Sequence, residues 1–309
     1  MEYIVENEYS GKTVREVIKK RLGISMATLK HLKFLDDGIM LNGVRVTVRA
    51  EVKEGDLLAL ATEDTESETK LTPCDLPLDI VYEDDFLVIP NKPADMPTHP
   101  SHDHYTDTVA NALAFRYGEQ GIPFVFRPVN RLDKDTSGLV LIAKHKVAAF
   151  RLSESMQKGE IHKSYLAVLC GHIPAESGEI RNFMHRDPES KMLRRICREE
   201  DDGAMLAITR YKRVAANDMF SVVVAAPITG RTHQLRLHFA SLGFPICGDT
   251  LYGYPYEFIG RQALHAFRLS FPHPMTQQRL CFSVPLPPDM AKLCQTVFGT
   301  NDFSQKVNL

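Results

Sequence analysis

Residues 127–144 read RPVNRLDKDTSGLVLIAK, a polar, charged loop that runs directly into an apolar strand. Asp133 and Asp135 stand in this loop among three basic side chains. Neighbouring cations favour the charged form of a carboxylate. A charged carboxylate at the mouth of a sheet can serve as a nucleophile or a general base. On the residues alone, a surface loop of salt bridges is the simpler interpretation.

The chain around this stretch predicts more strands than helices. The strand-like runs are 80–82, 86–89, 139–143, 164–169, 206–211, 220–225, 264–270 and 279–284. The helix-like runs are 108–117, 147–158, 231–242 and 289–298. Because the two kinds rarely alternate singly, we expect an α+β fold with a mixed, largely antiparallel sheet and flanking helices.

The N-terminal part predicts a separate small α/β unit. A helix beginning after Thr13 and a second one after Ser25 precede two short strands joined by the Asn42-Gly43 turn. An acidic, Ser/Thr-rich stretch follows, which is typical of a linker that lets two parts move. We therefore expect a small domain over 1–62, an acidic linker over 63–77 and a large domain over 78–309.

Composition and charge narrow the class of protein. The chain has 309 residues, 44% of them hydrophobic, and a net charge of −2. The acidic residues gather in 61–110, which holds two Lys/Arg against twelve Asp/Glu, whereas the flanking segments 12–60 and 111–309 are basic. Such local basic faces permit contact with phosphates. The six cysteines form no Cys-x-x-Cys pair, so they predict neither a zinc site nor a disulfide scaffold. No apolar run reaches the length of a membrane span, and the first residues do not form a secretory signal. We therefore expect a cytoplasmic protein.

The segment RLDKDTSGLVLIAK resembles the catalytic motif of the RluA-type pseudouridine synthases, written Arg-Leu-Asp-x-x-Thr-Ser-Gly before an apolar strand. The resemblance implies that Asp133 is the catalytic carboxylate. It also implies that Arg131 takes the place of the extruded base or grips a phosphate. The family often has His before the Arg, and this chain has Asn130 there, a variation that leaves the Arg-Leu-Asp core intact.

Two further segments resemble motifs of the same family. KSYLAVLCG, from Lys163, is similar to its Lys-x-Tyr segment, which implies that Tyr165 stacks on the target uracil and that Lys163 contacts the substrate. GRTHQLRLH and GFPICGD are similar to its third motif, which implies that Arg231 pairs with the catalytic carboxylate and that Leu235 lines an apolar pocket. Without the company of the other motifs, Tyr165 would be interpreted as a core aromatic residue.

Two loop segments complete the resemblance. NKPADMPTHP, residues 91–100, is similar to the family's Lys-Pro-x-Gly-x-Pro-x-His loop, which makes His99 a candidate for substrate contact. Asp95 stands where the family usually has Gly, so the loop backbone is expected to differ locally. Leu264-His265-Ala266 is similar to a strand near the active site, which makes His265 a second candidate. The histidines of these loops are expected to face RNA and not a metal ion.

The small N-terminal unit, with LKFLDDGIMLNGVRV and VKEGDLLAL, resembles an RNA-binding domain named after a small-subunit ribosomal protein. In that family two helices present basic residues to RNA. The candidates that this resemblance implies are Arg15, Lys19, Lys30 and Lys33. The simpler interpretation is that these residues only form the solvated faces of two helices.

Together the motifs predict an isomerase that converts uridines of structured RNA to pseudouridine. We expect ribosomal RNA first and transfer RNA second, no cofactor or metal, no DNA or membrane partner, and a monomer. Two other functions compete: an RNA-binding protein without turnover, and a carboxylate hydrolase using Asp133 with Asp135. The intact motif residues argue against the first function, and the absence of tryptophan, common in sugar sites, argues against the second.

Overall fold

The computed structural model describes residues 2–22, 29, 32–33, 37–61, 71–190 and 192–303. Two sheets organise this part of the chain, a large one of twelve strands and a small one of four. The predicted second helix and Lys30 lie outside the described residues, as does most of the predicted linker. No described helix is long and apolar enough to cross a membrane.

The large sheet has the order β12-β11-β13-β14-β10-β15-β8-β6-β9-β7, with β16 beside β15 and β5 beside β6. Among the described pairings only β8 with β15 is parallel, which agrees with the predicted mixed, largely antiparallel sheet. Its strands are β5 (Asp79–Glu83), β6 (Leu87–Lys92), β7 (Arg127–Pro128), β8 (Ser137–Leu139), β9 (Ile142–Ala143), β10 (His162–Cys170), β11 (Ser177–Arg186), β12 (Arg194–Cys197), β13 (Met205–Ala216), β14 (Phe220–Pro227), β15 (Leu264–Pro272) and β16 (Arg279–Ser283).

Four helices flank this sheet: α3 (Val109–Glu119), α4 (Lys146–Gln157), α5 (Gln234–Ser241) and α6 (Pro288–Phe298). Helix α3 begins at a capping box in which Thr108 and Asn111 satisfy each other's backbone amides. The centre of the sheet is buried on both faces, since five consecutive residues of β10 and six consecutive residues of β14 are buried. This buried centre gives the residues at its edge a rigid support.

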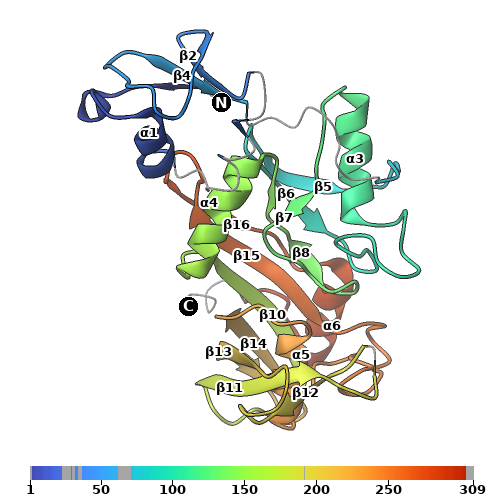
Figure 1. The fold of residues 1–309 in the computed structure, drawn as a ribbon. Helices are drawn as coiled ribbons and strands as arrows, with labels where there is room; N and C mark the ends of the chain where they lie inside the picture. The colour runs from blue at the N-terminus through green and yellow to red at the C-terminus, as the bar shows by residue number, and fades with distance from the viewer. Residues whose placement is uncertain are drawn as a thin grey trace.

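The predicted strand over 139–143 is divided in the structure. β8 and β9 both pair with β6, but with different ends of it, so Val140 and Leu141 lie between two short strands. The sequence analysis missed the hairpin of β11 and β12. This hairpin lies at the edge of the sheet farthest from the N-terminus, and Figure 1 shows it at the bottom of the molecule.

The small sheet has the order β1-β4-β2-β3 and packs on α1 (Val14–Lys20). Thr13 and Glu16 form the predicted capping box, and Asn42 and Gly43 both have positive φ, as a two-residue hairpin turn requires. The elements are β1 (Glu2–Ile4), the short 3-10 helix η1 (Asn7–Tyr9), β2 (Ile39–Leu41), β3 (Val44–Arg45) and β4 (Leu57–Leu60).

The small sheet and α1 pack against the large body through α4. Val147 of α4 belongs to the apolar core of the small unit. Arg151, one turn further, donates from Nε to the carbonyl oxygen of Leu22 at 2.8 Å and from Nη1 to that of Pro274 at 2.8 Å. Figure 1 shows the small sheet above this helix. The contact thus combines apolar packing at Val147 with the hydrogen bonds of the Arg151 guanidinium.

Candidate active site

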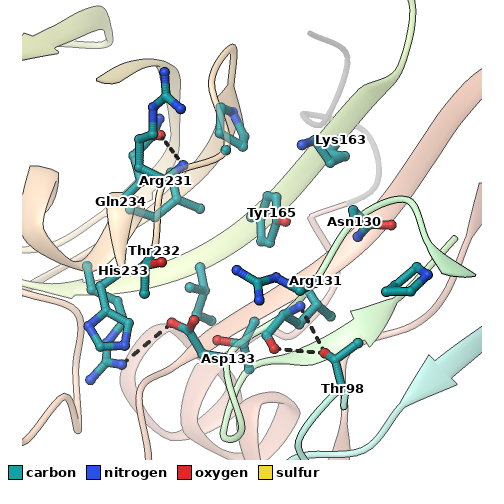
Figure 2. Close-up of a pocket in the computed structure, with 18 of the residues that line it drawn as sticks. Thr98, Asn130, Arg131, Asp133, Lys163, Tyr165, Arg231, Thr232, His233 and Gln234 are labelled. Carbon is teal, nitrogen blue, oxygen red and sulfur yellow. Dashed lines mark hydrogen bonds and ion pairs between the residues drawn. The ribbon is translucent and has the colours of Figure 1, made fainter. Parts of the chain in front are cut away.

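A pocket of about 830 Å³ lies where the loop that carries Asp133, strand β10 and the start of α5 meet. Figure 2 shows Asp133 and Arg131 facing Tyr165 across it. Among the described residues that line the pocket, Asp133 is the only acidic side chain. Five cationic side chains line it as well: Arg131, Lys134, Lys163, Arg231 and Arg236. The pocket is therefore suited to an anionic ligand.

Two side chains from the preceding loop hold the backbone on either side of Asp133. The Thr98 hydroxyl donates to the carbonyl oxygen of Leu132 at 2.9 Å and accepts from the amide of Leu132 at 3.1 Å. Lys92 is fully buried, and its Nζ donates to the carbonyl oxygen of Lys134 at 2.7 Å and to those of Pro93 and Met96. Burial lowers the pKa of Lys92 to about 7.

A second group holds the loop from behind. Arg261 donates to the carbonyl oxygen of Asp135 at 2.9 Å and is itself paired with Asp289 of α6 at 2.7 Å. Asn130 accepts from the amide of Leu141 at 2.7 Å through its side-chain oxygen. Asn130 is thus a buried residue that supports the loop. Its amide oxygen accepts the backbone hydrogen bond at a position where the RluA-type family often has His. A loop held at so many points keeps the Asp133 carboxylate in one place.

Asp95 shows how the loop accommodates the residue that replaces Gly. Its φ is +61°, a left-handed conformation that glycine adopts without strain. The Asp95 carboxylate lies 2.9 Å from Nζ of Lys134 in the catalytic loop. The Asp95 carboxylate thus adds an ion pair between the two loops.

Asp133 pairs with Arg236, whose Nη1 lies 3.6 Å from a carboxylate oxygen of Asp133. Figure 2 draws this ion pair as a dashed line from Asp133. The Arg236 side chain is 6% exposed and that of Asp133 is 28% exposed. Arg236 also binds the fully buried Asp249 through two hydrogen bonds of 2.7 Å. A bidentate pair of this kind fixes both the position and the direction of a guanidinium.

The prediction that Arg231 pairs with Asp133 is wrong in this structure. Arg231 is exposed, and its Nε donates to the carbonyl oxygen of Leu206 in β13. The helix that was expected from 231 begins only at Gln234, because His233 has φ +58° and turns the chain. Arg231 therefore precedes the helix at the pocket rim, while Arg236 occupies its first turns and points inward.

Tyr165 and Leu235 lie in the pocket wall as expected. Tyr165 is 7% exposed on β10, opposite Ala225 of β14. Burial, with the charge of Asp133 as a second cause, raises the pKa of Tyr165, so its hydroxyl stays protonated. Lys163 lies two residues before it on the same strand and lines the pocket. Burial lowers the pKa of Lys163.

The two candidate histidines have different positions. His99 lines the pocket, and its Nε2 lies 3.4 Å from Nη1 of the exposed Arg131. Burial and the charge of Arg131 lower the pKa of His99. His265 is 1% exposed, does not line the pocket, and meets the Ser137 hydroxyl at 2.9 Å through Nδ1. Substrate contact was predicted for His265, but the structure places this residue behind the loop, where it supports Ser137.

The sequence analysis missed Arg236, Asp249, Lys92 and Arg261 as site residues. Arg236 and Asp249 stand inside the motifs already quoted, so their residue types were visible but their pairing across thirteen positions was not.

On the small unit, Arg15 and Lys19 are exposed on α1, and Lys33 is also exposed. No group of three His, Cys, Asp or Glu side chains within the described ranges could hold a metal ion.

Comparison with known proteins agrees with this geometry. The RNA pseudouridylate synthase family matches residues 86–241. The chain is 41% identical to the uncharacterized RNA pseudouridine synthase YjbO of Bacillus subtilis, over 91% of this chain and 98% of that protein. It is 34% identical to the ribosomal large subunit pseudouridine synthase D of Escherichia coli, over 85% and 83% of the two chains.

Solved structures give the same family. The structure of human RNA pseudouridylate synthase domain containing 1 superposes with a TM-score of 0.55 at 30% identity, covering 69% of this chain and 86% of the human chain. The fold is also that of human RNA pseudouridylate synthase domain containing 4, with a TM-score of 0.56. The chain belongs to the RNA pseudouridylate synthase family and is an RNA pseudouridine synthase, an isomerase.

Proposed function

From this membership we propose that the enzyme isomerises specific uridines of structured RNA, with Asp133 as the catalytic carboxylate. The observation that carries the proposal is the charge of the pocket. One carboxylate stands there among five cationic side chains, fixed by a buried guanidinium that is itself fixed by Asp249. The cations suit the phosphates of RNA, and the single carboxylate suits a reaction that needs one catalytic acid or base group.

The reaction breaks the bond between N1 of uracil and C1′ of ribose and forms a bond between C5 and C1′. The proton on C5 leaves to solvent, and N1 gains one, so no electron acceptor or group carrier takes part. Three steps are open to the Asp133 carboxylate: addition to the uracil ring, addition to C1′, or removal of a ribose proton. Each requires the carboxylate to lie against an extruded nucleotide, because a stacked base hides these atoms.

The remaining pocket residues receive positioning roles in this proposal. Tyr165 supports the plane of the extruded uracil, and Leu235 gives it an apolar wall. Arg236 holds Asp133 at 3.6 Å. Arg131 at the exposed rim occupies the vacated stack or binds a flanking phosphate, as its free position beside His99 allows. The RNA backbone on either side of the extruded nucleotide is contacted by Lys163, Arg231 and His99.

We place ribosomal RNA first among the substrates. The support is that several relatives of 34–36% identity are named ribosomal large subunit pseudouridine synthase D. Transfer RNA is the second candidate. Tritium release from RNA labelled at C5 of uridine separates them: the proposal expects release from unmodified ribosomal RNA and little from transfer RNA. Release from transfer RNA alone would reverse this order, and release from neither RNA would contradict the assignment of both substrates.

We also propose that the small unit over 1–62 binds RNA through Arg15, Lys19 and Lys33, and that 63–77 serves as its linker. The support is the exposure of the three cations. Because this unit packs on α4, substitution in the full chain is preferable to deletion. A triple variant should weaken RNA binding and reduce the slope of log affinity against log salt by roughly 2–3. It combines Arg15→Gln, Lys19→Gln and Lys33→Gln. Lys292→Gln, on the exposed face of α6, is the control, and an equal slope in both variants would contradict the proposal.

A further inference from the structure

Two thiols lie in contact outside the pocket. Sγ of Cys170, the last residue of β10, is 3.1 Å from Sγ of Cys247. Hydrogen bonds hold the two segments together on both sides of the thiols. The amide of Cys170 donates to the carbonyl oxygen of Pro245, and that of Cys247 donates to the carbonyl oxygen of Val168, each at 2.8 Å. The fold therefore holds the two backbone segments that carry the thiols side by side.

The two thiols differ in access and in acidity. Cys170 is half-buried, whereas Cys247 is fully buried. The hydrogen bond between the two sulfurs lowers the pKa of Cys170. The same hydrogen bond, together with burial, raises the pKa of Cys247. A half-buried sulfur in contact with a second, fully buried sulfur is an arrangement in which the outer thiol can react first and the inner one can resolve the product.

We propose that Cys170 and Cys247 are a redox modification site that closes to an intrachain disulfide by exchange with a low-molecular-weight disulfide. The Cys170 thiolate attacks one sulfur of that disulfide, whose other half leaves as a thiolate. Cys247 then gives its proton to solvent and attacks Sγ of Cys170, which expels the second thiolate. Two protein thiols are oxidised and one small disulfide is reduced to two thiols, so the exchange balances.

The disulfide would join β10 to the segment that supports the catalytic carboxylate. A disulfide needs about 2.05 Å between the sulfurs, so they must approach by about 1 Å. Cys247 is two residues before Asp249, which fixes Arg236 by two hydrogen bonds. Because the bond joins residues 77 positions apart, it restricts the unfolded chain and stabilises this segment against heat. The disulfide would be a reversible crosslink in the segment that leads to Asp249.

The other cysteines provide controls. Cys281 is exposed, and among the described residues no second sulfur lies in contact with it. Cys294 is buried in α6, and burial raises its pKa to about 12, so it stays a thiol. Oxidation governed by exposure alone would therefore begin at Cys281. Reaction at the proposed pair would begin at Cys170.

The test is to treat the folded full chain with oxidised glutathione, block free thiols and map the peptides by mass spectrometry. We expect a peptide pair linked through Cys170 and Cys247, reversal by dithiothreitol, and the same result in Cys281→Ser. Cys247→Ser should stop at glutathione bound to Cys170, and Cys170→Ser should leave Cys247 reduced. The oxidised wild type should unfold at a temperature higher by roughly 5 °C.

Three results would overturn the proposal. They are glutathione that remains on Cys170 of the wild type, a link from Cys247 to Cys294, and reaction at Cys281 with the pair still reduced. Circular dichroism of each variant confirms that it is folded. No RNA or turnover enters the measurement, so its failure is distinguishable from failure of the proposed substrate.

Discussion

The floor and the rim of the pocket hold charge in opposite ways. The floor consists of Asp133 and Arg236, joined by an ion pair of 3.6 Å, together with the buried Asp249 behind them, which binds Arg236 at 2.7 Å. The rim consists of Arg131 and Arg231, which are exposed and make one weak contact and one backbone contact respectively. Charged side chains that are held in place need little reorganisation when charge develops in a transition state. Exposed cationic side chains can instead adjust to phosphates at different positions. In the proposed function, chemistry therefore belongs to the floor and contact with the RNA backbone to the rim.

Among the residues that support or surround Asp133, Arg236 in the floor should give the largest effect when it is replaced. Arg236→Met removes the cation and leaves the buried Asp249 carboxylate with only the backbone amides of Leu251 and Tyr252 as donors, so the unfolding free energy should fall by about 3–5 kcal/mol. Turnover should fall by roughly 10²-fold or more, because Asp133 loses its anchor. Arg236→Lys keeps the charge and should recover part of the stability. Urea unfolding and tritium release measure the two effects, and near-normal turnover in a folded Arg236→Met protein would contradict the role of the floor.

Removing the support under the floor should have a smaller effect. Lys92→Met leaves three buried carbonyl oxygens without their donor and frees the backbone next to Asp133. We expect a loss of about 2 kcal/mol in unfolding free energy and roughly tenfold in kcat, with KM unchanged. Lys144→Met is the matched control, because Lys144 binds Glu83 and the Asp84 carbonyl oxygen and does not line the pocket. A drop in kcat of equal size in the control would show that stability alone is measured.

The floor should also have a recognisable dependence on acid. Burial raises the pKa of Asp249, but the hydrogen bonds from Arg236 outweigh it, and the pKa lies below its ordinary value. The contribution of Asp249 to stability is therefore fully present above the unfolded pKa of about 4 and is lost as pH falls through the folded value. The difference in unfolding free energy between wild type and Asp249→Asn should shrink between about pH 6 and about pH 3. A difference that stays constant over this range would contradict the sign of the shift.

Changes at the rim should be the mildest. Arg231→Ala removes an exposed cation, so KM for RNA should rise a few-fold while kcat stays within about twofold. The slope of log affinity against log salt should fall by about 1 if Arg231 contacts one phosphate. Fold stability should change by less than about 0.5 kcal/mol. A large fall in kcat for Arg231→Ala would place this residue in the floor and reverse the comparison.

Local sequence signals predicted the parts of the fold that depend on neighbours in the chain. The capping box at Thr13, the Asn42-Gly43 turn and the helices around 109–119, 146–157 and 288–298 are as expected, within a few residues. The hairpin of β11 and β12 was missed because its solvated edge mixes charged and apolar residues without regular alternation. Its order in the sheet comes from pairing with β13, which lies at long range.

The candidate site shows the same limit. Asp133, Tyr165 and Leu235 were found from residue type and motif, and all three line the pocket. The partner of Asp133 was misplaced because the left-handed turn at His233 sets where α5 begins, and no periodicity in the sequence reveals a single positive φ. Asp249 acts through a tertiary contact, which only the folded chain brings together.

The most direct test compares Asp133→Asn with Asp135→Asn at saturating RNA. Both remove one charge from the same loop, but Asp133 lines the pocket and Asp135 does not. We expect Asp133→Asn to bind RNA with near-normal affinity and to lose tritium release by about 10⁴-fold, while Asp135→Asn keeps release within about tenfold. Normal tritium release from Asp133→Asn would contradict a catalytic role for Asp133. An equal loss of release in both variants would contradict the claim that Asp133, and not Asp135, is the catalytic carboxylate.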